Sequence, residues 1–301
     1  MFINHFWPFI VLSMLATCNG LQQETPSIEP FPAIETMLKT DSYNTKAQQL
    51  STKVMISTGR KKTEVIDFAD SNVKCEDLED FPMETQAAVG ANLVSTPIIC
   101  GGLFYNGSHH SSDVCFKYMK GGWQQFATMI ERRTWAAGIV YDNALHIFGG
   151  YDQDTNTILQ SSEIVKEDGN SIEGAQLPKP IYAHAIASIN STVSIITGGN
   201  SYSDKTWYFN HASQEFQPGP NLLEGRYHHS AGYVIDQETK EKMAIISGGY
   251  NIDISEGNVD IIYLDSTEML MNGQWMTGKT HTESNTCSFL VPSARVGIKL
   301  S

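Results

Sequence analysis

The sequence predicts an all-β fold built from repeated four-stranded antiparallel sheets, and two observations support this. First, a short apolar run that ends in two glycines occurs at 98–102, 146–150, 195–199 and 245–249, so that the second glycine returns after 48, 49 and 50 residues. Second, neighbouring runs rich in Val, Ile and Tyr are bounded by Gly, Asn, Asp and Ser, a pattern typical of short strands. A constant period near fifty residues indicates stacked copies of one unit, and radially repeated four-stranded sheets make a β-propeller.

Each unit is expected to contain four strands. The first precedes a polar turn, the second runs into the glycine pair, the third follows the next loop, and the fourth is weaker and contains a large aromatic residue. The expected first strands are 135–141, 184–189 and 230–235; the third strands are 113–119, 162–166, 206–210 and 260–264; the fourth strands contain Trp123, Phe216 and Trp275.

The glycine pairs are expected to fix the end of each second strand. A glycine there permits positive φ and the close approach of another backbone segment, which a residue with a Cβ atom tolerates only at a cost. The pairs are Gly101 with Gly102, Gly149 with Gly150, Gly198 with Gly199, and Gly248 with Gly249.

These features together resemble the kelch repeat. Besides the glycine pair, the sequence has aromatic residues in the third strand, a Trp in the fourth, and connectors such as LLEGRYHHS at 222–230 and LVPSARVG at 290–297. The aromatic residues are Trp207, Tyr208 and Tyr263. The resemblance covers residues 50–301 and implies a kelch-type β-propeller. The second repeat departs from the pattern, because it lacks a Trp near Ile172 and has Pro180 where the connector usually carries Arg.

The N-terminus has the layout of a secretory signal peptide at residues 1–20. An apolar core from Phe6 to Ala16 is followed by small residues, and cleavage after Cys18 or after Gly20 fits that layout. A buried N-terminal strand and a lipoprotein site at Cys18 are the alternatives. Residues 21–49, rich in Gln, Glu, Thr, Ser and Pro, are expected to form a polar linker or arm, and the protein is expected to be secreted.

Five blades are expected, because the two ends of the repeat region complement each other. Runs at 53–60, 63–68 and 75–81 supply the second, third and fourth strands of a unit with no first strand, and the run at 294–301 resembles a first strand. Pairing the two would close the circle and satisfy both open edges. The blades are marked by Gly59, Gly102, Gly150, Gly199 and Gly249. A truncated six- or seven-bladed propeller is the alternative.

Composition limits the class of partner. The net charge of −13 and the pI near 5.1 argue against nucleic acids and anionic membranes as ligands. No stretch after the signal peptide is long and apolar enough to span a bilayer, so no membrane insertion is expected.

Four cysteines follow the predicted cleavage site, and in an oxidising compartment they predict two disulfides. Cys100 ends a second strand and Cys115 lies in the neighbouring third strand, so one bond is expected there and the other between Cys75 and Cys287. Sequence alone allows three pairings, and free buried thiols are the alternative. Sequons for N-glycosylation occur in predicted turns at Asn106 and Asn190.

No catalytic or metal-binding motif is found, and no cofactor is expected. The His pairs at 109–110 and 228–229 lack the spacing of zinc sites, and the second pair lies where kelch repeats carry packing residues. Kelch-like propellers also include copper radical oxidases and sugar mutarotases, which gives an enzymatic alternative. In a copper radical oxidase, Tyr227, His228 and Cys100 would be the candidate residues.

The expected function is binding or adhesion, with a protein or glycan ligand held by loops on one face of the propeller. The loops after the glycine pairs and the connectors between blades emerge on that face, and Tyr and Arg are enriched at interface hot spots. This inference rests partly on fold, which does not imply function. The alternative is that the Tyr side chains cover the glycine turns and the Arg side chains bridge blades. The candidate residues are Tyr105, Tyr151, Tyr202, Tyr250, Arg132, Arg226 and Arg295.

Overall fold

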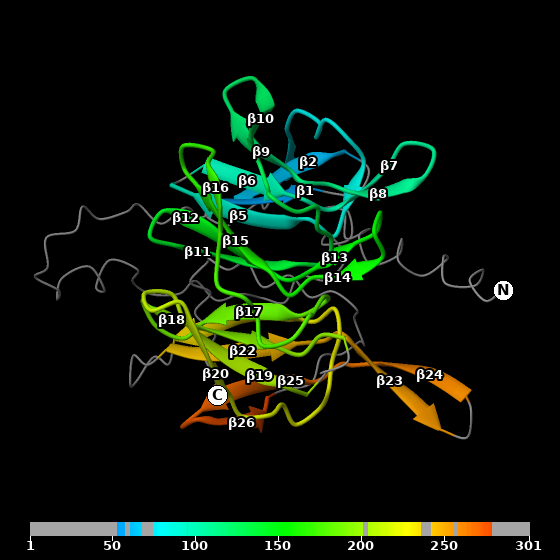
Figure 1. Ribbon diagram of the computed structural model, residues 1–301, viewed down its shortest axis with the longest axis vertical. Helices are drawn as coiled ribbons and strands as arrows, with labels where there is room; N and C mark the ends of the chain where they lie inside the picture. Colours follow the sequence, from blue (N-terminus) through cyan, green and yellow to red (C-terminus); the bar gives the residue numbers. More distant parts are fainter. Residues whose placement is uncertain are drawn as a thin grey trace, which may run out of the picture.

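The computed structural model describes residues 53–57, 61–67, 75–94, 96–200, 204–235, 242–255 and 258–278. Every regular element within these ranges is a β-strand (Figure 1). The described ranges contain no helix with the length and apolar character that crossing a membrane requires.

Five antiparallel sheets follow one another along the chain. Sheet I contains β1 (Lys53–Ser57), β2 (Thr63–Asp67) and β3 (Cys75–Asp77). Sheet II contains β5 (Val89–Leu93), β6 (Thr96–Cys100), β9 (Val114–Met119) and β10 (Gly122–Thr128). Sheet III contains β11 (Ala137–Tyr141), β12 (Ala144–Phe148), β15 (Ser162–Lys166) and β16 (Ser171–Glu173). Sheet IV contains β17 (Ala185–Ser188), β18 (Val193–Thr197), β19 (Thr206–Asn210) and β20 (Glu215–Pro218). Sheet V contains β21 (Ser230–Ile235), β22 (Lys242–Ser247), β25 (Thr267–Met271) and β26 (Gln274–Thr277). This succession of one three-stranded and four four-stranded sheets fits a β-propeller-like fold.

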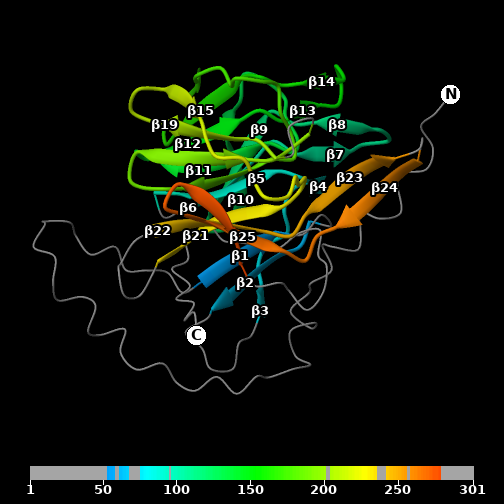
Figure 2. The ribbon, with the colours of Figure 1, turned by 90° about the horizontal axis from the view of Figure 1, so that it is seen from below.

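Three sheets carry an extra hairpin between their second and third strands. The hairpins are β7–β8 (Leu103–Tyr105 and His109–Ser111), beside which β4 (Thr85–Gln86) pairs with β7, then β13–β14 (Tyr151–Asp152 and Thr157–Ile158) and β23–β24 (Tyr250–Ser255 and Asn258–Tyr263). Both views place all three at one end of the molecule, on the right in Figures 1 and 2. Each hairpin directly follows a glycine pair, so we call this end the glycine-pair face.

The predicted third strand of sheet V, 260–264, is wrong. That run belongs to β24, and the third strand is β25. The run has the stronger strand pattern, whereas β25 carries a buried carboxylate, Glu268, that a sequence pattern does not expect inside a sheet. The other predicted first and third strands of sheets II to V agree with the observed ones to within two residues.

Sheet I has the three predicted strands, in the order β1–β2–β3. Its predicted fourth strand, 75–81, is shorter than expected and ends at Asp77. The predicted closing strand at 294–301, and Gly59, lie outside the described residues. Closure and blade number therefore stay predictions.

The hydrophobic core lies between neighbouring sheets. Val89 of sheet II belongs to a buried cluster with Leu145 of sheet III, and Phe148 of sheet III to one with Phe209 of sheet IV. A third cluster joins sheets IV and V. Each fully buried side chain of this size contributes about 1.5–3 kcal/mol, so packing between sheet faces holds the repeat together.

The glycine pairs leave no room for a side chain. The second glycine of each described pair has φ between 87° and 107°. A Cβ atom on Gly249 would lie 2.4 Å from the Tyr227 carbonyl oxygen, and one on Gly149 would lie 2.3 Å from the Ile181 carbonyl oxygen. Both carbonyls belong to the connectors between sheets, so each connector packs directly against a glycine pair.

The predicted disulfide between Cys100 and Cys115 is present, with Cα atoms 4.0 Å apart on the paired strands β6 and β9. Both cysteines are buried. A sulfur atom already bonded to another Cys cannot form the Tyr–Cys crosslink of a copper radical oxidase, so that role for Cys100 is wrong. Cys287, the predicted partner of Cys75, lies outside the described residues.

Candidate ligand-binding site

The connectors into sheets II to V share an uncommon backbone conformation. Ala87, Trp135, Ala183 and His228 have φ of 53°, 52°, 56° and 50°, a region that residues other than glycine rarely adopt. The Trp135 N–H donates to the Ala87 carbonyl (3.0 Å), the Ala183 N–H to the Trp135 carbonyl (2.9 Å), and the His228 N–H to the Ala183 carbonyl (2.9 Å). This continuous line of bonds carries the connectors from sheet II to sheet V into one shared region.

Two loops on the glycine-pair face add tyrosines to this region. Tyr151, at the start of β13, exchanges both backbone hydrogen bonds with Thr134 (2.8 and 2.9 Å). Tyr250, at the start of β23, does the same with Tyr227 (2.8 and 3.0 Å). The hairpins are therefore fixed against the connectors where they begin.

Six ring side chains from these segments contact one another and form the aromatic cluster. Trp135 joins its two halves, since its ring centre lies 6.0 Å from Tyr151, 5.9 Å from Tyr182 and 6.0 Å from His228. All six side chains are half-buried. The cluster consists of Trp135, Tyr151, Tyr182, Tyr227, His228 and Tyr250.

Tyr250, Tyr227 and His228 form the second half of the cluster. Its ring stacks on Tyr227, with centres 5.5 Å apart and planes at 12°, and on His228, at 5.5 Å and 22°. Tyr263 of β24 meets it edge to face at 6.3 Å and is 43% exposed. The aromatic surface thus continues from the connectors onto the β23–β24 hairpin.

The cluster carries no net charge at neutral pH but has polar atoms to offer. Burial lowers the pKa of His228 to about 4, so its imidazole is neutral. Burial, with smaller effects of Tyr151 and Tyr227, raises the pKa of Tyr182. In the part of the chain that the structure describes, no hydrogen-bond partner contacts the Trp135 indole N–H or the hydroxyls of Tyr182 and Tyr227. Half-buried polar atoms without protein partners are suited to a ligand.

The structure places the predicted binding residues in different environments. Tyr151 and Tyr250 belong to the aromatic cluster, whereas Tyr105 is 58% exposed on β7. Arg132 is half exposed, with Nη1 3.5 Å from Asp154 Oδ2. Tyr202 and Arg295 lie outside the described residues.

Arg226 is not available to a partner, which contradicts its assignment to the binding face. Its side chain is fully buried, and it donates to Glu268 Oε1 (2.7 Å) and to the Gly248 carbonyl (2.9 Å). Glu268 also accepts the N–H groups of Leu223 and Glu224, at 2.8 and 3.2 Å. Arg226 therefore ties the connector to β25 and to the glycine pair, as the packing alternative expected.

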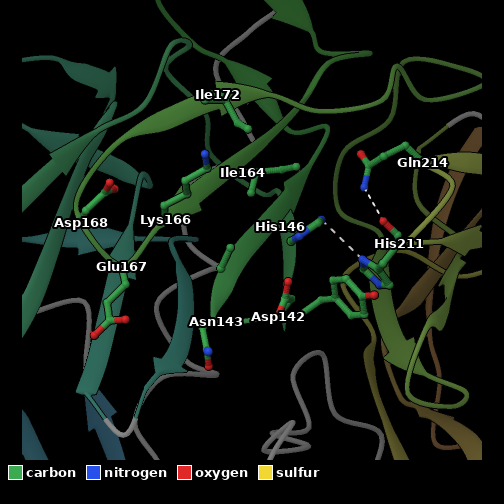
Figure 3. Close-up of a pocket in the computed structure, with 12 residues that line it drawn as sticks. Asp142, Asn143, His146, Ile164, Lys166, Glu167, Asp168, Ile172, His211 and Gln214 are labelled. Atoms are coloured by element: carbon green, nitrogen blue, oxygen red, sulfur yellow. Dashed lines mark hydrogen bonds between the residues drawn. The ribbon is translucent and has the colours of Figure 1, made fainter.

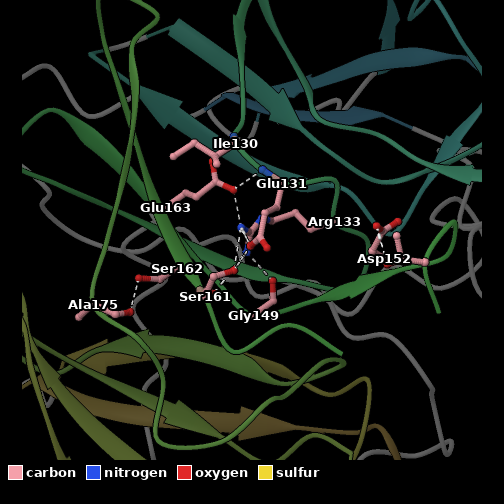
Figure 4. A network of polar contacts seen from close by, with 10 residues as sticks. Ile130, Glu131, Arg133, Gly149, Asp152, Ser161, Ser162, Glu163 and Ala175 are labelled. Carbon is pink, nitrogen blue, oxygen red and sulfur yellow. Dashed lines mark hydrogen bonds and ion pairs between the residues drawn. The ribbon is translucent and has the colours of Figure 1, made fainter. Parts of the chain in front are cut away.

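Arg133, which is not among the residues predicted from sequence, forms the same network in sheet III (Figure 4). It donates to the Gly149 carbonyl at 2.7 Å and to Glu163, and Glu163 accepts the N–H groups of Ile130 and Glu131 at 2.6 and 2.9 Å. A repeated sequence pattern marks this network. A Glu lies two positions before the Arg in both connectors, as Glu131 and Arg133 and as Glu224 and Arg226, and the second residue of the following third strand is also Glu.

Sheet IV has apolar side chains in place of this ion pair. Ile181 occupies the connector position of Arg226, since its carbonyl accepts the N–H of the second glycine of a pair in the same way. Trp207 occupies the strand position of Glu163, because Trp207 pairs with Ile196 as Glu163 pairs with Ile147. Ile181 and Trp207 belong to the same apolar cluster. The residue that replaces the connector Arg is thus Ile181, and the prediction of Pro180 is wrong.

A second candidate is a cavity of about 730 Å³ on the opposite face, between sheets III and IV (Figure 3). Its floor contains His146 and His211, with Nδ1 atoms 3.4 Å apart, and His211 Nε2 lies 2.8 Å from the Ser194 hydroxyl. Burial lowers the pKa of both imidazoles to about 4. These ring nitrogens already contact protein groups, whereas the aromatic cluster has polar atoms without partners. We therefore favour the cluster as the ligand site.

No group of three His, Cys, Asp or Glu side chains that could hold a metal ion occurs among the described residues. The His pair at 109–110 lies on β8, and the pair at 228–229 lies in the connector into sheet V. His229 is buried, and its Nε2 lies 2.8 Å from the Thr197 hydroxyl of sheet IV. These His residues therefore contact protein groups in two separate parts of the fold.

Comparison with known proteins supports the fold and gives no information on the site. No family model matches the chain, and neither does any curated protein. The solved structure of YjhT is similar, with a TM-score of 0.69 over 78% of this chain and 82% of that chain, at 12% sequence identity. At this identity the similarity concerns the repeated all-β architecture alone.

Proposed function

We propose that the protein is a binding module that holds a glycan on its glycine-pair face, at the aromatic cluster. The observation that carries this proposal is the meeting of six half-buried rings from the connectors into sheets III, IV and V and from two hairpins, with an indole N–H and two phenol hydroxyls that have no partner among the described residues. Sites for small ligands are commonly lined by aromatic side chains with a few polar groups that fix orientation.

A sugar ring fits this chemistry because it has both apolar C–H faces and hydroxyl groups. The faces can pack on aromatic rings, and the hydroxyls can bond to the tips of Trp135, Tyr182 and Tyr227. A neutral His228 removes the positive charge that would favour an acidic ligand. A protein partner is the other occupant. It would need about 800 Å² of surface, so its interface would have to extend from the cluster over the three hairpins.

We also propose the finer architecture, a kelch-type propeller of five blades closed by pairing of 294–301 beside β1. The strand order of sheet I supports it, since the described part of that sheet lacks the first strand that the other sheets have. Deleting 294–301 should cause aggregation or loss of cooperative unfolding. Unchanged thermal stability of the shortened protein would contradict closure.

We propose secretion and N-glycosylation as well. The disulfide between Cys100 and Cys115 supports an oxidising compartment. Asn106 and Asn190 are both exposed in turns, as acceptor sites require. Peptide mapping of the secreted protein, before and after removal of N-glycans, tests both sites.

The ligand proposal is tested by screening the purified protein on a glycan array and titrating each hit by intrinsic fluorescence, for which Trp135 is a reporter within the site. Tyr182→Ala should weaken binding at least tenfold, because it removes one face and one hydroxyl of the cluster. Tyr141→Ala, beside the cavity on the opposite face, is the matched control and should leave binding unchanged. Binding that is lost in the Tyr141 variant and kept in the Tyr182 variant would move the site to the cavity.

A sugar mutarotase-like activity is the enzymatic alternative, with the neutral His228 imidazole placed to exchange a proton with a bound sugar. Polarimetry with each glycan that binds tests it. Equilibration faster than in buffer, and lost in His228→Ala, would favour the enzyme over the binding module.

A further inference from the structure

Three side chains on two neighbouring hairpins of the glycine-pair face lie in series. The Ser108 hydroxyl oxygen lies 2.7 Å from His110 Nε2, and His110 Nδ1 lies 2.5 Å from Asp154 Oδ1. Ser108 and His110 belong to the β7–β8 hairpin of sheet II, and Asp154 belongs to the turn of the β13–β14 hairpin of sheet III. A hydroxyl, an imidazole and a carboxylate joined through these atoms have the connectivity of a nucleophile, its base and the acid that orients the base.

The carboxylate is held in place on its other side. Asp154 Oδ2 accepts the backbone N–H of Ser111 at 3.1 Å and lies 3.5 Å from Nη1 of Arg132. Partial burial opposes ionisation, but the bonds from His110 and Ser111 and the charge of Arg132 outweigh it, so the pKa of Asp154 is lowered. Asp154 is therefore ionised at neutral pH. It can fix one tautomer of His110, with the proton on Nδ1 and the lone pair of Nε2 facing Ser108.

We propose that Ser108, His110 and Asp154 form a hydrolytic triad that cleaves acyl esters. Ser108 is exposed, and the His110 side chain is 33% exposed, so both can reach a bound substrate. Arg132, half exposed next to Asp154, helps to keep that carboxylate ionised, as its role in the triad requires. The alternative is a purely structural role, in which the three residues hold the two hairpins together.

We take acetyl as the acyl group, because the exposed Ser108 can reach an acetyl ester without a dedicated acyl-binding pocket. The Ser111 hydroxyl donates to the Tyr151 carbonyl (3.3 Å) and accepts the N–H of Gln153 (2.8 Å), which places the triad next to the aromatic cluster. An O-acetylated sugar held at the cluster would thus have its ester near Ser108. This choice of substrate rests on the proposed glycan site, whereas ester hydrolysis itself does not.

The reaction proceeds in two balanced steps. The Ser108 oxygen attacks the ester carbonyl carbon while its proton passes to His110 Nε2. The ester C–O bond then breaks, and the same proton goes from His110 to the departing alkoxide. The alkoxide leaves as an alcohol, and the acyl group stays bound to the Ser108 oxygen. A water molecule gives a proton to His110 and attacks the acyl carbon. The acid is released and the proton returns to Ser108, so one ester and one water give one alcohol and one carboxylic acid.

The full-length protein tests this with two readouts, covalent labelling by a fluorophosphonate probe and release of p-nitrophenol from p-nitrophenyl acetate. We expect the label on Ser108 by peptide mass spectrometry, and Ser108→Ala should lower the hydrolysis rate at least 100-fold. Because Ser108 also completes the sequon of Asn106, Asn106→Gln is the matched control: it removes the sequon, keeps the hydroxyl and should keep full activity. Asp154→Asn should lower both labelling and hydrolysis, because it changes the tautomer of His110. Thermal stability of this variant is measured as a control for folding.

Two results would overturn the triad. One is the absence of label on Ser108 in a protein whose fold is verified by circular dichroism. The other is a Ser108→Ala variant that hydrolyses the ester at the parent rate. Two separate readouts distinguish this proposal from the glycan site: glycan binding on the array reports the aromatic cluster, whereas labelling of Ser108 and hydrolysis of p-nitrophenyl acetate report the triad and require no glycan. If instead glycans do not bind but Ser108 is labelled, the triad stands and the substrate class is wrong.

Discussion

Acidification should unfold this protein well above the pH at which its carboxylates titrate, because several His residues are buried as neutral imidazoles. His146, His184, His211 and His229 are each at most 6% exposed. Burial lowers the pKa of His146 and His211 to about 4 and that of His184 to about 3, and it lowers the pKa of His229 well below its ordinary value. Two of them lie where neighbouring sheets meet: His211 faces His146 of sheet III, and His229 contacts Thr197 of sheet IV.

The sign and size of the effect follow from proton linkage. In the unfolded chain an imidazole titrates near pH 6.5, so it binds a proton there that the folded protein excludes until about pH 4. The contribution of each neutral imidazole to the free energy of unfolding is therefore fully present above pH 6.5, and it is lost as the pH falls from 6.5 toward 4. Between pH 8 and pH 5 the loss is about 2 kcal/mol for each such His, and about 6 kcal/mol for His146, His184 and His211 together. This is comparable with the whole stability of a typical domain, about 5–15 kcal/mol.

Urea unfolding followed by circular dichroism at pH 8, 7, 6 and 5 measures this dependence. His211→Gln should remove about 2 kcal/mol of the pH dependence, since it deletes one titrating group, although it also lowers stability at pH 8. A free energy of unfolding that differs by less than about 1 kcal/mol between pH 8 and pH 5 would refute the assignment of these imidazoles as buried and neutral.

Three further predictions concern stability at neutral pH, each measured by urea unfolding. Glu268→Gln should cost about 3–5 kcal/mol because it leaves a buried guanidinium without its counter-charge, whereas Arg132→Ala, which breaks half-exposed ion pairs, should cost less than about 1 kcal/mol; equal losses would contradict the buried network. Gly249→Ala should cost at least about 2 kcal/mol more than Gly273→Ala, since both have positive φ but only the first has a backbone atom within 2.4 Å of the new Cβ. Reducing the disulfide between β6 and β9 should cost about 3 kcal/mol, as a closed loop of 15 residues predicts, and an unchanged midpoint in reductant would argue against the bond.

The strands and glycine pairs could be predicted from sequence because their signals are local. Four apolar runs before glycines mark the second strands, and the steric demand seen at Gly149 and Gly249 explains why the pairs recur. The third strand of sheet V could not be predicted, because the burial of Glu268 depends on Arg226, which lies 42 positions away. A single sequence does not show which carboxylate meets which guanidinium.

The candidate site was only half predictable for a related reason. Tyr151 and Tyr250 were found because they follow glycine pairs, but Trp135 and Tyr182 lie in connectors whose register is set by backbone hydrogen bonds between sheets. The same register turns Arg133 inward and leaves Arg132 at the surface. Two adjacent residues of one connector thus differ in exposure, one buried and one at the surface, and composition and spacing alone do not predict which is which.

The difference between the two faces is the structural reason for seeking function on the glycine-pair face. Two of the described connections on the opposite face are tight turns: Asp142 and Asn143, with φ of 47° and 56°, link β11 to β12, and Asn272 with Gly273, at 51° and 75°, links β25 to β26. Two positive-φ residues are the mark of the shortest hairpin turns, which add no inserted segment to that face. The glycine-pair face instead carries three inserted hairpins. The blade interior does not require these hairpins, and loops added to a rigid scaffold are where proteins place binding and catalytic groups. The aromatic cluster and the triad of Ser108, His110 and Asp154 both lie there, so one substrate could contact the two sites together.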